Sequence, residues 1–494
     1  RKENDFAYSH LPKPAGNSSW ISIFDQALKG KMEGVILSGM TAASIGPDAN
    51  QVHEALGKLK WLVVMDAFPT TSSEFWHAPG ADPSSIQTEV FVLPATHWIE
   101  KSGSFTNSGR WLQWKDEVLP PEGQARHDHW VLADLFLRVR ELYQRNGGAF
   151  PDPIMDLTFD YKDPRKPGFD EIAREVNGKD LKAGTQMKSF KDLTDDGSTS
   201  SGNWIYVGSW TEDGNMMERR NGVQDVKKND PTGMGFFPEW AFSWPANRRV
   251  LYNRASADPA GKPWDPSRPG IKWDAKQKLW VGDVPDYLPD ADPSDPTSPL
   301  PFIMTGEGTG RLFSNGLSDG PFPEHYEPVE SPIANPLHPK VSISPATFLY
   351  DKAAGRPNRF GTAKDFPYIG TTYRLTEHEH YVTQHVEKLV ALQPEAFVEV
   401  PAELAREKGI ETGDMVRVSS KRGKLEVRAL VTNRLGALTI DGKKVFHIGI
   451  PIHWGYVGIN TGDHWLANAL TPFVGDATVR TPEFKAFLVN MEKM

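Results

Sequence analysis

Short apolar runs alternate with an amphipathic segment near the start of the chain. Residues 35–38, 62–65 and 89–93 are three mostly apolar runs, each of a length that fits one buried strand. Between the first two, residues 48–59 carry apolar side chains at helical spacing behind an aspartate that can begin a helix. This order predicts a parallel, doubly wound α/β sheet, a fold that binds nucleotides at the carboxyl ends of its strands.

A longer amphipathic stretch begins at Asp128. One helical face there carries the apolar residues Leu132, Leu135, Phe136, Val139 and Leu142. An aspartate in front of such a stretch usually caps the helix, because its carboxylate accepts hydrogen bonds from the free N–H groups of the first turn. A hydrogen bond to a bound guanine is the alternative role for Asp128, and the local pattern favours the cap.

The last third of the chain, residues 336–494, is dominated by short strands. A helix over residues 402–408, ended by Gly409, interrupts them, and a hairpin closes at residues 421–423. Several short strands with one short helix predict a small closed β-barrel. The expected strands are residues 397–400, 415–419, 424–431, 438–440 and 445–452.

Between these parts, proline, aspartate, glycine and tryptophan dominate and apolar periodicity is weak. The segment keeps too many aromatic residues for a disordered linker. We expect long ordered loops with little regular structure. The predicted organisation is an α/β domain at 1–150, a loop-rich region at 151–335 and a β domain at 336–494.

Composition narrows the possible functions. The net charge of −9 argues against nucleic acid as a partner, since proteins that bind phosphate backbones usually present a basic face. The chain has no cysteine, so it cannot itself hold an iron–sulfur cluster, a zinc–thiolate site or a disulfide. No apolar run reaches the ~18–20 residues that span a bilayer, and we expect a soluble protein. The chain opens with a polar segment at Arg1, which suggests processing or a piece of a longer protein.

Four residues near the first two predicted strands are candidates for binding. Gly39, with Thr41 and Ser44 after it, lies at a strand-to-helix turn where backbone N–H groups can meet a phosphate. Tight turns also need a glycine for steric reasons alone. Asp66 ends the second strand, where a carboxylate can accept hydrogen bonds from ribose hydroxyls or guanine N–H groups. A solvated loop acid is the alternative for Asp66.

Residues 370–385 form the densest polar cluster of the chain. His378 and His380 would share one face of a strand and permit a metal site, but no third ligand stands at suitable spacing. A loop that binds phosphate or a pterin fits better, with Arg374 as the paired donor. His453, Asn468 and residues 481–485 add polar groups at strand ends. No catalytic triad, phosphate-binding loop or carboxylate pair is evident, so local motifs assign no catalytic residue.

Seven stretches carry a resemblance to a known family. The chain resembles the C-terminal half of the large subunit of respiratory, periplasmic-type formate dehydrogenases, in the dimethyl sulfoxide reductase superfamily. The resemblance covers essentially the whole chain. The matching stretches are residues 93–111, 208–220, 247–259, 320–328, 368–381, 448–456 and 469–490.

The resemblance implies a fold and a cofactor. The first region would be Rossmann-like, and the last a double-psi six-stranded barrel that caps the cofactor. Such enzymes hold molybdenum or tungsten between two molybdopterin guanine dinucleotides. By motif position, one nucleotide site would be lined by Gly39, Thr41, Asp66, Thr70 and Asp128. The pterins would be approached by Thr372, Arg374, His380, Thr383, His453, Asn468, Phe484 and Lys485.

The resemblance also implies partners. The family keeps its 4Fe–4S cysteines, its selenocysteine or cysteine on the metal and its substrate-binding arginine in the N-terminal half. No catalytic residue or metal ligand is therefore expected in this chain. Expected partners are that N-terminal half, an iron–sulfur β subunit, a membrane cytochrome subunit and formate, in the periplasm. The alternatives are nitrate reductase or another oxyanion reductase, and a non-catalytic scaffold.

Overall fold

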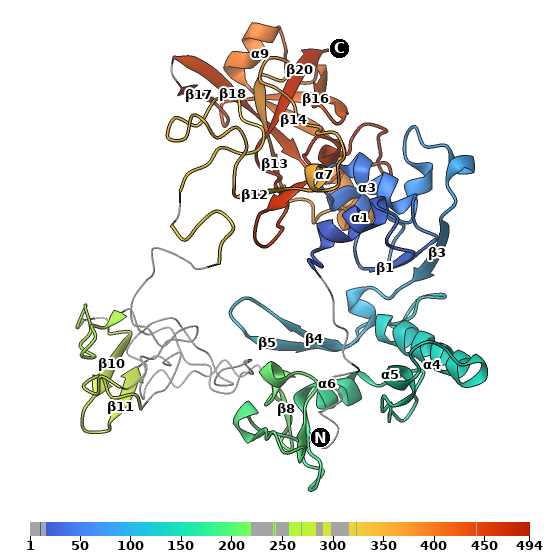
Figure 1. Cartoon of the computed structure of the whole chain (residues 1–494), viewed down its shortest axis with the longest axis vertical. Coiled ribbons are helices and arrows are strands. Elements are labelled where there is room, and N and C mark those ends of the chain that lie inside the picture. Colours follow the sequence, from blue (N-terminus) through green and yellow to red (C-terminus); the bar gives the residue numbers. More distant parts are fainter. Residues whose placement is uncertain are drawn as a thin grey trace. The chain divides into compact units, whose positions relative to one another are not determined.

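The computed structural model describes most of the chain as two compact units, each considered by itself (Figure 1). The first unit comprises Arg1–Lys13 with Thr96–Arg311, and the second comprises Pro14–Ala95 with Leu312–Met494. Most of the stretch 247–259, and parts of 208–220 and 320–328, lie outside the described residues. Those described are 10, 16–218, 241, 243, 256–267, 269–282, 290–297, 316–322, 324–440 and 442–494.

The second unit begins with the predicted α/β segment. Its three strands are parallel in the order β1-β2-β3, which confirms the parallel sheet expected from the apolar runs. Asp48 caps α3, with its carboxylate accepting from the N–H of Gln51. The elements are α1 (Trp20–Leu28), β1 (Gly34–Ser38), α2 (Ala42–Ile45), α3 (Ala49–Leu56), β2 (Trp61–Asp66) and β3 (Glu89–Pro94).

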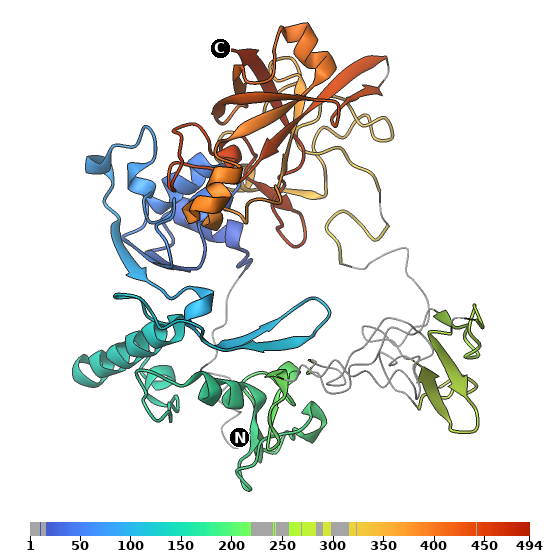
Figure 2. The ribbon, with the colours of Figure 1, turned by 180° about the vertical axis from the view of Figure 1, so that it is seen from behind.

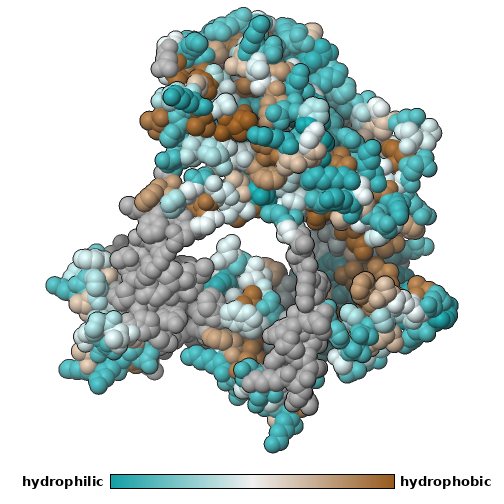
Figure 3. Space-filling model, in the orientation of Figure 1, coloured by the Kyte–Doolittle hydropathy of each residue, from teal (hydrophilic) through white to brown (hydrophobic). Residues whose placement is uncertain are grey.

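The two faces of this sheet differ in burial. Leu37, Leu62 and Val64 lie in one core cluster with side chains of α1 and α3. On the opposite face the register places Ile36 beside Val63, and Val63 beside Phe91. Ile36 and Phe91 remain 42% and 43% exposed. Figure 3 shows hydrophobic residues at the surface over β3.

The second unit ends in a closed barrel of six strands, as predicted. The order β13-β20-β15-β16-β14-β18 returns to β13, and β17 pairs only with β18. The β13–β18 and β14–β16 pairs are parallel and the other pairs antiparallel. The strands are β13 (Tyr368–Tyr373), β14 (Phe397–Pro401), β15 (Met415–Ser419), β16 (Lys424–Thr432), β17 (Ala437–Ile440), β18 (Lys443–Pro451) and β20 (Phe487–Lys493).

Local sequence explains the barrel's helix and its hairpin. Helix α9 (Ala402–Lys408) ends at Gly409, whose φ of +64° suits a residue without a side chain. Both views place α9 at the end of the barrel away from α1 and α3 (Figures 1 and 2). The turn after β15 closes through a bond from the N–H of Ser420 to the carbonyl of Gly423. Both elements match their predicted bounds to within a residue.

Shorter elements connect the sheet to the barrel. Strand β13 ends at Tyr373, so the expectation that His378 and His380 share a strand face is wrong. These elements are η2 (Phe75–His77), η3 (Pro83–Ser85), β12 (Thr347–Leu349), α7 (Tyr350–Ala353), η9 (Val382–His385), α8 (Glu387–Leu392), η10 (Ala467–Ala469) and β19 (Val474–Asp476).

The first unit is made of short elements and one longer helix, α4 (Asp128–Asn146). The predicted apolar face of α4 is largely exposed, at Leu132, Leu135 and Leu142. The other elements are η4 (Trp98–Glu100), β4 (Gly103–Thr106), β5 (Leu112–Lys115), α5 (Asp152–Met155), α6 (Phe169–Asn177), β6 (Lys179–Asp180), η5 (Phe190–Asp192), β7 (Thr199–Ser200), η6 (Trp204–Tyr206), β8 (Trp210–Thr211), β9 (Gly214–Asn215), η7 (Met216–Glu218), β10 (Ile271–Asp274) and β11 (Leu279–Gly282).

Two further observations concern the whole described chain. The α/β sheet and the barrel belong to the same compact unit. The domain boundaries at residues 150 and 335 stay a prediction. Among the helices of the described residues, none is both long and apolar enough to cross a membrane.

Candidate functional site

A cavity of about 210 Å³ lies at the carboxyl ends of β1 and β2, inside the second unit. It brings together two parts of the sequence that are more than 300 residues apart, the sheet and the segment that follows β13. Five predicted site residues line it: Gly39, Thr41, Asp66, Thr70 and His380. Sequence reasoning did not single out four other lining residues, Phe68, Thr71, Tyr381 and His385.

The turn after β1 shapes one wall of the cavity. Gly39 adopts a φ of +60°, a conformation that costs glycine little, and its N–H donates to the carbonyl of Met65 at 2.9 Å. The chain then enters α2, where the N–H of Ala43 donates to the hydroxyl of Ser72 and the N–H groups of Ser44 and Ile45 donate to the carbonyl of Thr41, each at 3.1 Å. The predicted role of Gly39 as a turn residue is consistent with this geometry.

Hydroxyl groups meet behind this turn. The hydroxyls of Thr41 and Thr71 lie 2.6 Å apart, and that of Ser44 also bonds to Thr71. The carbonyl of Ser44 accepts from the hydroxyl of Tyr381 and from Nδ2 of Asn468, each at 2.8 Å. Ser44 is fully buried. Ser44 and Asn468 therefore hold the wall together and do not line the cavity.

The mouth of the cavity carries a carboxylate and an aromatic pair. Asp66 is partly exposed, and its Oδ1 accepts from the N–H of Ala67 at 2.8 Å. Phe68 and His385 stack with ring centroids 4.8 Å apart and planes 3° apart. Burial lowers the pKa of His385, which the nearby charge of Asp66 opposes. A neutral stacked pair next to a carboxylate suits a planar polar ligand.

Thr70 has a local role in the same segment. Its hydroxyl accepts from the N–H of Ser73 at 3.2 Å, and its carbonyl accepts from the hydroxyl of Ser73 and the N–H of Glu74, each at 3.0 Å. These bonds close the turn after β2. Thr70 lines the cavity while its hydroxyl organises the turn.

Near the end of β13 a second polar group forms around Thr372. Its N–H and its hydroxyl both donate to the carbonyl of Phe484, at 3.3 and 2.7 Å, and Nζ of Lys485 donates to the carbonyl of Thr372. Burial, and then the charge of Arg374, lower the pKa of Lys485. Arg374 is exposed and has no hydrogen bond or ion pair to any residue that the structure describes. The positive charge of Arg374 is thus close enough to Lys485 to disfavour the charged form of that lysine.

His453 supports the segment that carries these groups. Its Nε2 accepts from the N–H of Leu375 at 2.8 Å, and its Nδ1 faces the carbonyl of His380 at 2.9 Å. Burial lowers the pKa of His453 to about 4, so the ring is neutral at neutral pH. Both ring nitrogens are occupied by backbone, and the side chain positions the segment between Leu375 and His380.

His378 and Thr383 satisfy each other. Nδ1 of His378 lies 2.9 Å from the hydroxyl of Thr383, and its Nε2 lies 2.9 Å from the carbonyl of Gln393. The protein itself therefore uses both ring nitrogens of His378. Within the described ranges no group of three histidines, cysteines or acids is placed to hold a metal ion.

His380 and Asn468 each keep a buried polar atom without a partner. These atoms are Nδ1 of His380 and Oδ1 of Asn468. A buried polar atom without a hydrogen bond costs roughly 1–3 kcal/mol, which a bound ligand can recover. His380 also has a φ of +44°, a strained conformation for a residue with a side chain.

Asp128 differs from its predicted role as a cap. His127 occupies the N-cap position, and Asp128 is the first residue inside α4. Its carboxylate bonds to the ammonium of Lys101, also in the first unit. An acid in the first turn still favours the helix through the macrodipole. Its place in a nucleotide site stays a prediction.

Comparison with known proteins adds two matches to this geometry. The Molybdopterin oxidoreductase family matches residues 17–138, and the Molydopterin dinucleotide binding domain matches residues 368–488. The nitrate-inducible formate dehydrogenase major subunit of Escherichia coli (strain K12) is 48% identical, over 100% of this chain and 49% of that protein. The chain belongs to the molybdopterin oxidoreductases.

Other relatives also match this chain along nearly its whole length. The α subunit of formate dehydrogenase 2 (cytochrome c-553) of Nitratidesulfovibrio vulgaris is 41% identical, over 99% of this chain and 49% of that protein. A nitrate reductase of Symbiobacterium thermophilum is 21% identical, over 96% of this chain and 43% of that protein. This molybdopterin oxidoreductase chain spans about half the length of the formate dehydrogenase subunits it matches.

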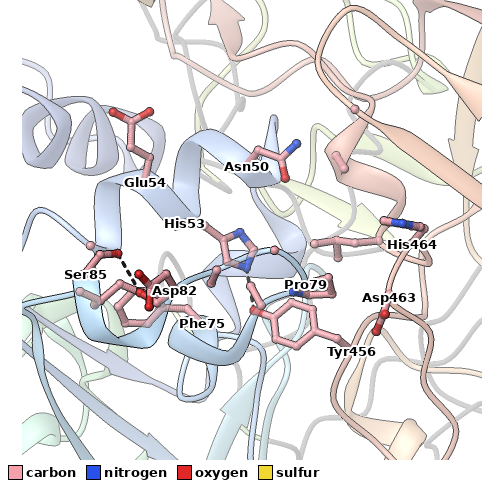
Figure 4. A pocket seen from close by; sticks show the side chains of 18 of the residues that line it. Asn50, His53, Glu54, Phe75, Pro79, Asp82, Ser85, Tyr456, Asp463 and His464 are labelled. Carbon is pink, nitrogen blue, oxygen red and sulfur yellow. Dashed lines mark hydrogen bonds between the residues drawn. The ribbon is translucent and has the colours of Figure 1, made fainter.

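A second, larger cavity of about 730 Å³ lies on another side of the same unit of this molybdopterin oxidoreductase (Figure 4). Helix α3, the segment 75–86, the β15–β16 turn and the segment 456–469 line it, and none of the predicted site residues does. His53 and Tyr456 meet inside it, with Nε2 of His53 2.6 Å from the hydroxyl of Tyr456.

Proposed function

We propose that this chain is the cofactor-binding C-terminal part of a formate dehydrogenase catalytic subunit, which oxidises formate to carbon dioxide. The observation that carries the proposal is the 210 Å³ cavity, where the sheet's strand ends meet the segment 380–385. We infer formate as the substrate because the whole chain is 48% identical to a formate dehydrogenase major subunit.

The residues around this cavity suit a dinucleotide with a fused polar ring system. Backbone N–H groups after Gly39 can donate to a phosphate, and Asp66 can accept from guanine N–H groups or ribose hydroxyls. Arg374 and Lys485 offer uncompensated positive charge to a phosphate or a pterin oxygen. Nδ1 of His380, a residue that lines the cavity, has no partner among the described residues and can bond to a polar group of a ligand.

The cofactor we infer is a bis-molybdopterin guanine dinucleotide with molybdenum or tungsten. Bound, it would supply the two-electron redox chemistry at the metal. Thr372, Phe484 and Lys485 would hold the pterin side through their mutual hydrogen bonds, with Arg374 as the fork donor. His453 and Thr383 would keep the loop in place from behind.

The proposed partners carry the groups that this sequence lacks. We infer that the other half of the subunit provides a 4Fe–4S cluster, the selenocysteine or cysteine on the metal, and the substrate-binding arginine. An iron–sulfur β subunit and a membrane cytochrome subunit would receive the electrons, in the periplasm. The exposed apolar face of the sheet at Ile36 and Phe91 is the surface we assign to the other half.

Two alternatives differ in what they predict. If the chain came from an oxyanion reductase, its sequence identity to the nitrate reductase relative should be the higher one. That identity is 21%, whereas the identity to a formate dehydrogenase major subunit is 48%. A non-catalytic scaffold would keep the fold without the cofactor. Formate should be oxidised by the assembled complex and by no preparation of this chain alone. A purified complex that contains neither molybdenum, tungsten nor pterin would contradict the proposal in favour of the scaffold.

A further inference from the structure

Three hydrogen bonds at the edge of the large cavity compete for too few protons. Nδ1 of His53 lies 2.5 Å from the carbonyl of Ala49, and its Nε2 lies 2.6 Å from the hydroxyl of Tyr456. The hydroxyl of Tyr456 lies 2.7 Å from the carbonyl of Thr71. Because a carbonyl only accepts, Tyr456 must donate to Thr71 and Nδ1 of His53 must donate to Ala49.

The proton count decides the state of the ring. With Tyr456 donating to Thr71, Nε2 of His53 must donate to Tyr456, so both ring nitrogens need a proton. A neutral imidazole carries one N–H, and only the imidazolium carries two. All three contacts can therefore be hydrogen bonds when His53 is charged. When His53 is neutral, one of the three contacts has no proton to share.

Burial pulls in the opposite direction. It lowers the pKa of His53, while the contact with the carbonyl of Ala49 raises it. Burial also raises the pKa of Tyr456 well above its ordinary value, so the phenol keeps its proton. The ring is thus poised between a neutral form that burial favours and a charged form that the hydrogen bonds favour.

The cavity gives His53 solvent access and a charged surrounding. Four carboxylates and two ammonium groups lie around the pair. The charged or titratable groups around the pair are Glu54 and Lys58 from α3, Glu74 and Asp82 from the segment 74–86, Lys424 from β16, and Asp463 and His464 from the segment 456–469. Figure 4 labels Glu54, Asp82, Asp463 and His464 among them.

Thr71 connects this group to the other cavity. Its carbonyl is held by Tyr456, and its hydroxyl bonds to those of Thr41 and Ser44. Thr41 and Thr71 both line the 210 Å³ cavity at the strand ends. The residue whose carbonyl accepts from Tyr456 is therefore itself part of that wall.

We propose that His53 and Tyr456 are positioning residues, which fix Thr71 when His53 is protonated and release it when His53 is neutral. The wall of the strand-end cavity then depends on pH, and a nucleotide bound there and a proton on His53 stabilise each other. The nucleotide part rests on the proposed function, whereas the link from His53 to Thr71 does not. By reciprocity, nucleotide binding raises the pKa of His53 by the same coupling.

The link can be tested in the full chain without any ligand. Histidine ¹³Cε1 signals and the backbone amide of Ser72, whose nitrogen is bonded to the Thr71 carbonyl carbon, are followed by NMR between about pH 5 and pH 8. His53→Gln assigns the histidine signal. We expect the Ser72 amide to titrate together with His53 in the wild type, and to lose this titration in Tyr456→Phe.

Tyr350→Phe is the matched control. It also removes a buried phenol, whose hydroxyl lies 2.8 Å from that of Ser22, far from His53 in the sequence and outside both cavities. It should leave the coupled titration intact. A His53 that stays neutral throughout the range, or a Ser72 amide that behaves alike in the wild type and Tyr456→Phe, overturns the proposal.

A second measurement tests the consequence for binding. Guanosine diphosphate is titrated into the wild-type chain, Tyr456→Phe and Tyr350→Phe at pH 5.5 and pH 7.5, so that the probe's own ionisation is common to all three. For each protein, the affinity at pH 5.5 is divided by the affinity at pH 7.5. We expect this ratio to be at least about fivefold larger in the wild type and in Tyr350→Phe than in Tyr456→Phe. Equal pH dependence in all three contradicts the coupling. Absence of binding in every protein at both pH values contradicts the proposed nucleotide site, and the Ser72 titration still decides the link.

Discussion

Around the barrel every one of the six strands has a hydrogen-bonded neighbour on both sides, whereas the described α/β sheet ends at β1 on one side and at β3 on the other. The barrel's inner side chains form one cluster that includes Val398, Val418 and Ile448, all fully buried. The sheet buries one face against α1 and α3 and leaves Ile36 and Phe91 on its second face partly exposed.

The difference teaches where each region obtains its stability. A closed barrel satisfies its own backbone and needs no further strand. A parallel sheet is normally covered on both faces, so an exposed apolar face calls for another layer. In a chain that spans about half the length of its relatives, we expect the sheet to depend on other segments and the barrel to depend on itself.

The largest expected effect breaks the barrel's internal support. Arg422, in the β15–β16 turn, forms a paired ion bond with Glu330 at 2.7 and 2.9 Å, and both side chains are buried. Arg422→Ala leaves the Glu330 carboxylate buried without its partner, which should cost about 3–5 kcal/mol in the free energy of unfolding. Urea denaturation of the full chain measures it.

Arg417 on β15 provides the control for that substitution. It pairs with Glu426 and Glu492 on the barrel surface, where solvent screens the charges. Arg417→Ala should leave the urea midpoint nearly unchanged. If both variants unfold at the same urea concentration, the ion pair of Arg422 does not support the barrel.

The next effect compares the two regions directly. Ile448 is fully buried in the barrel, and Ile36 on the open face of the sheet is 42% exposed. Ile448→Ala should cost about 2–5 kcal/mol in the free energy of unfolding, and Ile36→Ala about 1 kcal/mol or less. Adding the other half of the subunit should raise the cost of Ile36→Ala and leave that of Ile448→Ala unchanged. A cost of Ile36→Ala that is the same with and without the other half would sink the assignment of this face.

The fold could be predicted from the sequence wherever a local signal specifies a helix or a strand. Apolar runs predicted β1, β2 and β3, and the glycine after α9 predicted its end at Gly409, because each signal lies within the element it specifies. The start of α4 was predicted to within one residue, but its cap was not. His127 takes the cap position and Asp128 bonds to Lys101, a partner 27 residues away.

The site was harder to predict, because distant residues build it. Phe68 stacks on His385, and His53 meets Tyr456, pairs that are several hundred residues apart in the sequence. No local spacing signals such a contact. His378 was expected on a strand and instead turns back onto Gln393, since β13 ends five residues earlier. Polar clusters in the sequence thus indicate where a site lies better than which atoms face the ligand.

A smaller effect concerns the end of the barrel strand β13. Arg374→Ala in the assembled complex removes a cation near Lys485 that has no hydrogen bond or ion pair to the described residues, at a cost of roughly 1.5–3 kcal/mol for each charge-assisted bond to the cofactor. Arg374→Lys keeps the charge but loses the planar fork, so it should impair formate oxidation less severely. Pterin content, metal content and turnover are measured for the three forms.

Arg406, an exposed arginine on α9, is the control for Arg374. Arg406→Ala should retain full pterin content and turnover, since it changes the net charge equally without approaching the cavity. Near-normal turnover in both Arg374 variants would mean that Arg374 faces solvent in the complex, and the barrel's contact with the cofactor would have to be reassigned.

The smallest effect concerns the end of the sheet strand β2. Asp66 lies at the mouth of the strand-end cavity and is partly exposed, so its removal should change the urea midpoint little. Asp66→Ala should still reduce cofactor retention, by about tenfold if one charge-assisted bond to guanine is lost with some solvent compensation. Asp365→Ala, an exposed acid that accepts only from the hydroxyl of Thr362 at 3.0 Å among its side-chain bonds, should retain the cofactor fully. Retention is measured as pterin released by the purified complex during dialysis.

Asp66 lies at the end of a sheet strand, and Arg374 follows the end of a barrel strand. A larger loss of cofactor for the Asp66 variant than for the Arg374 variant would reverse the expected order. The sheet would then hold the cofactor more firmly than the barrel does. The second layer that the sheet needs would in that case support the cofactor site as well as the fold.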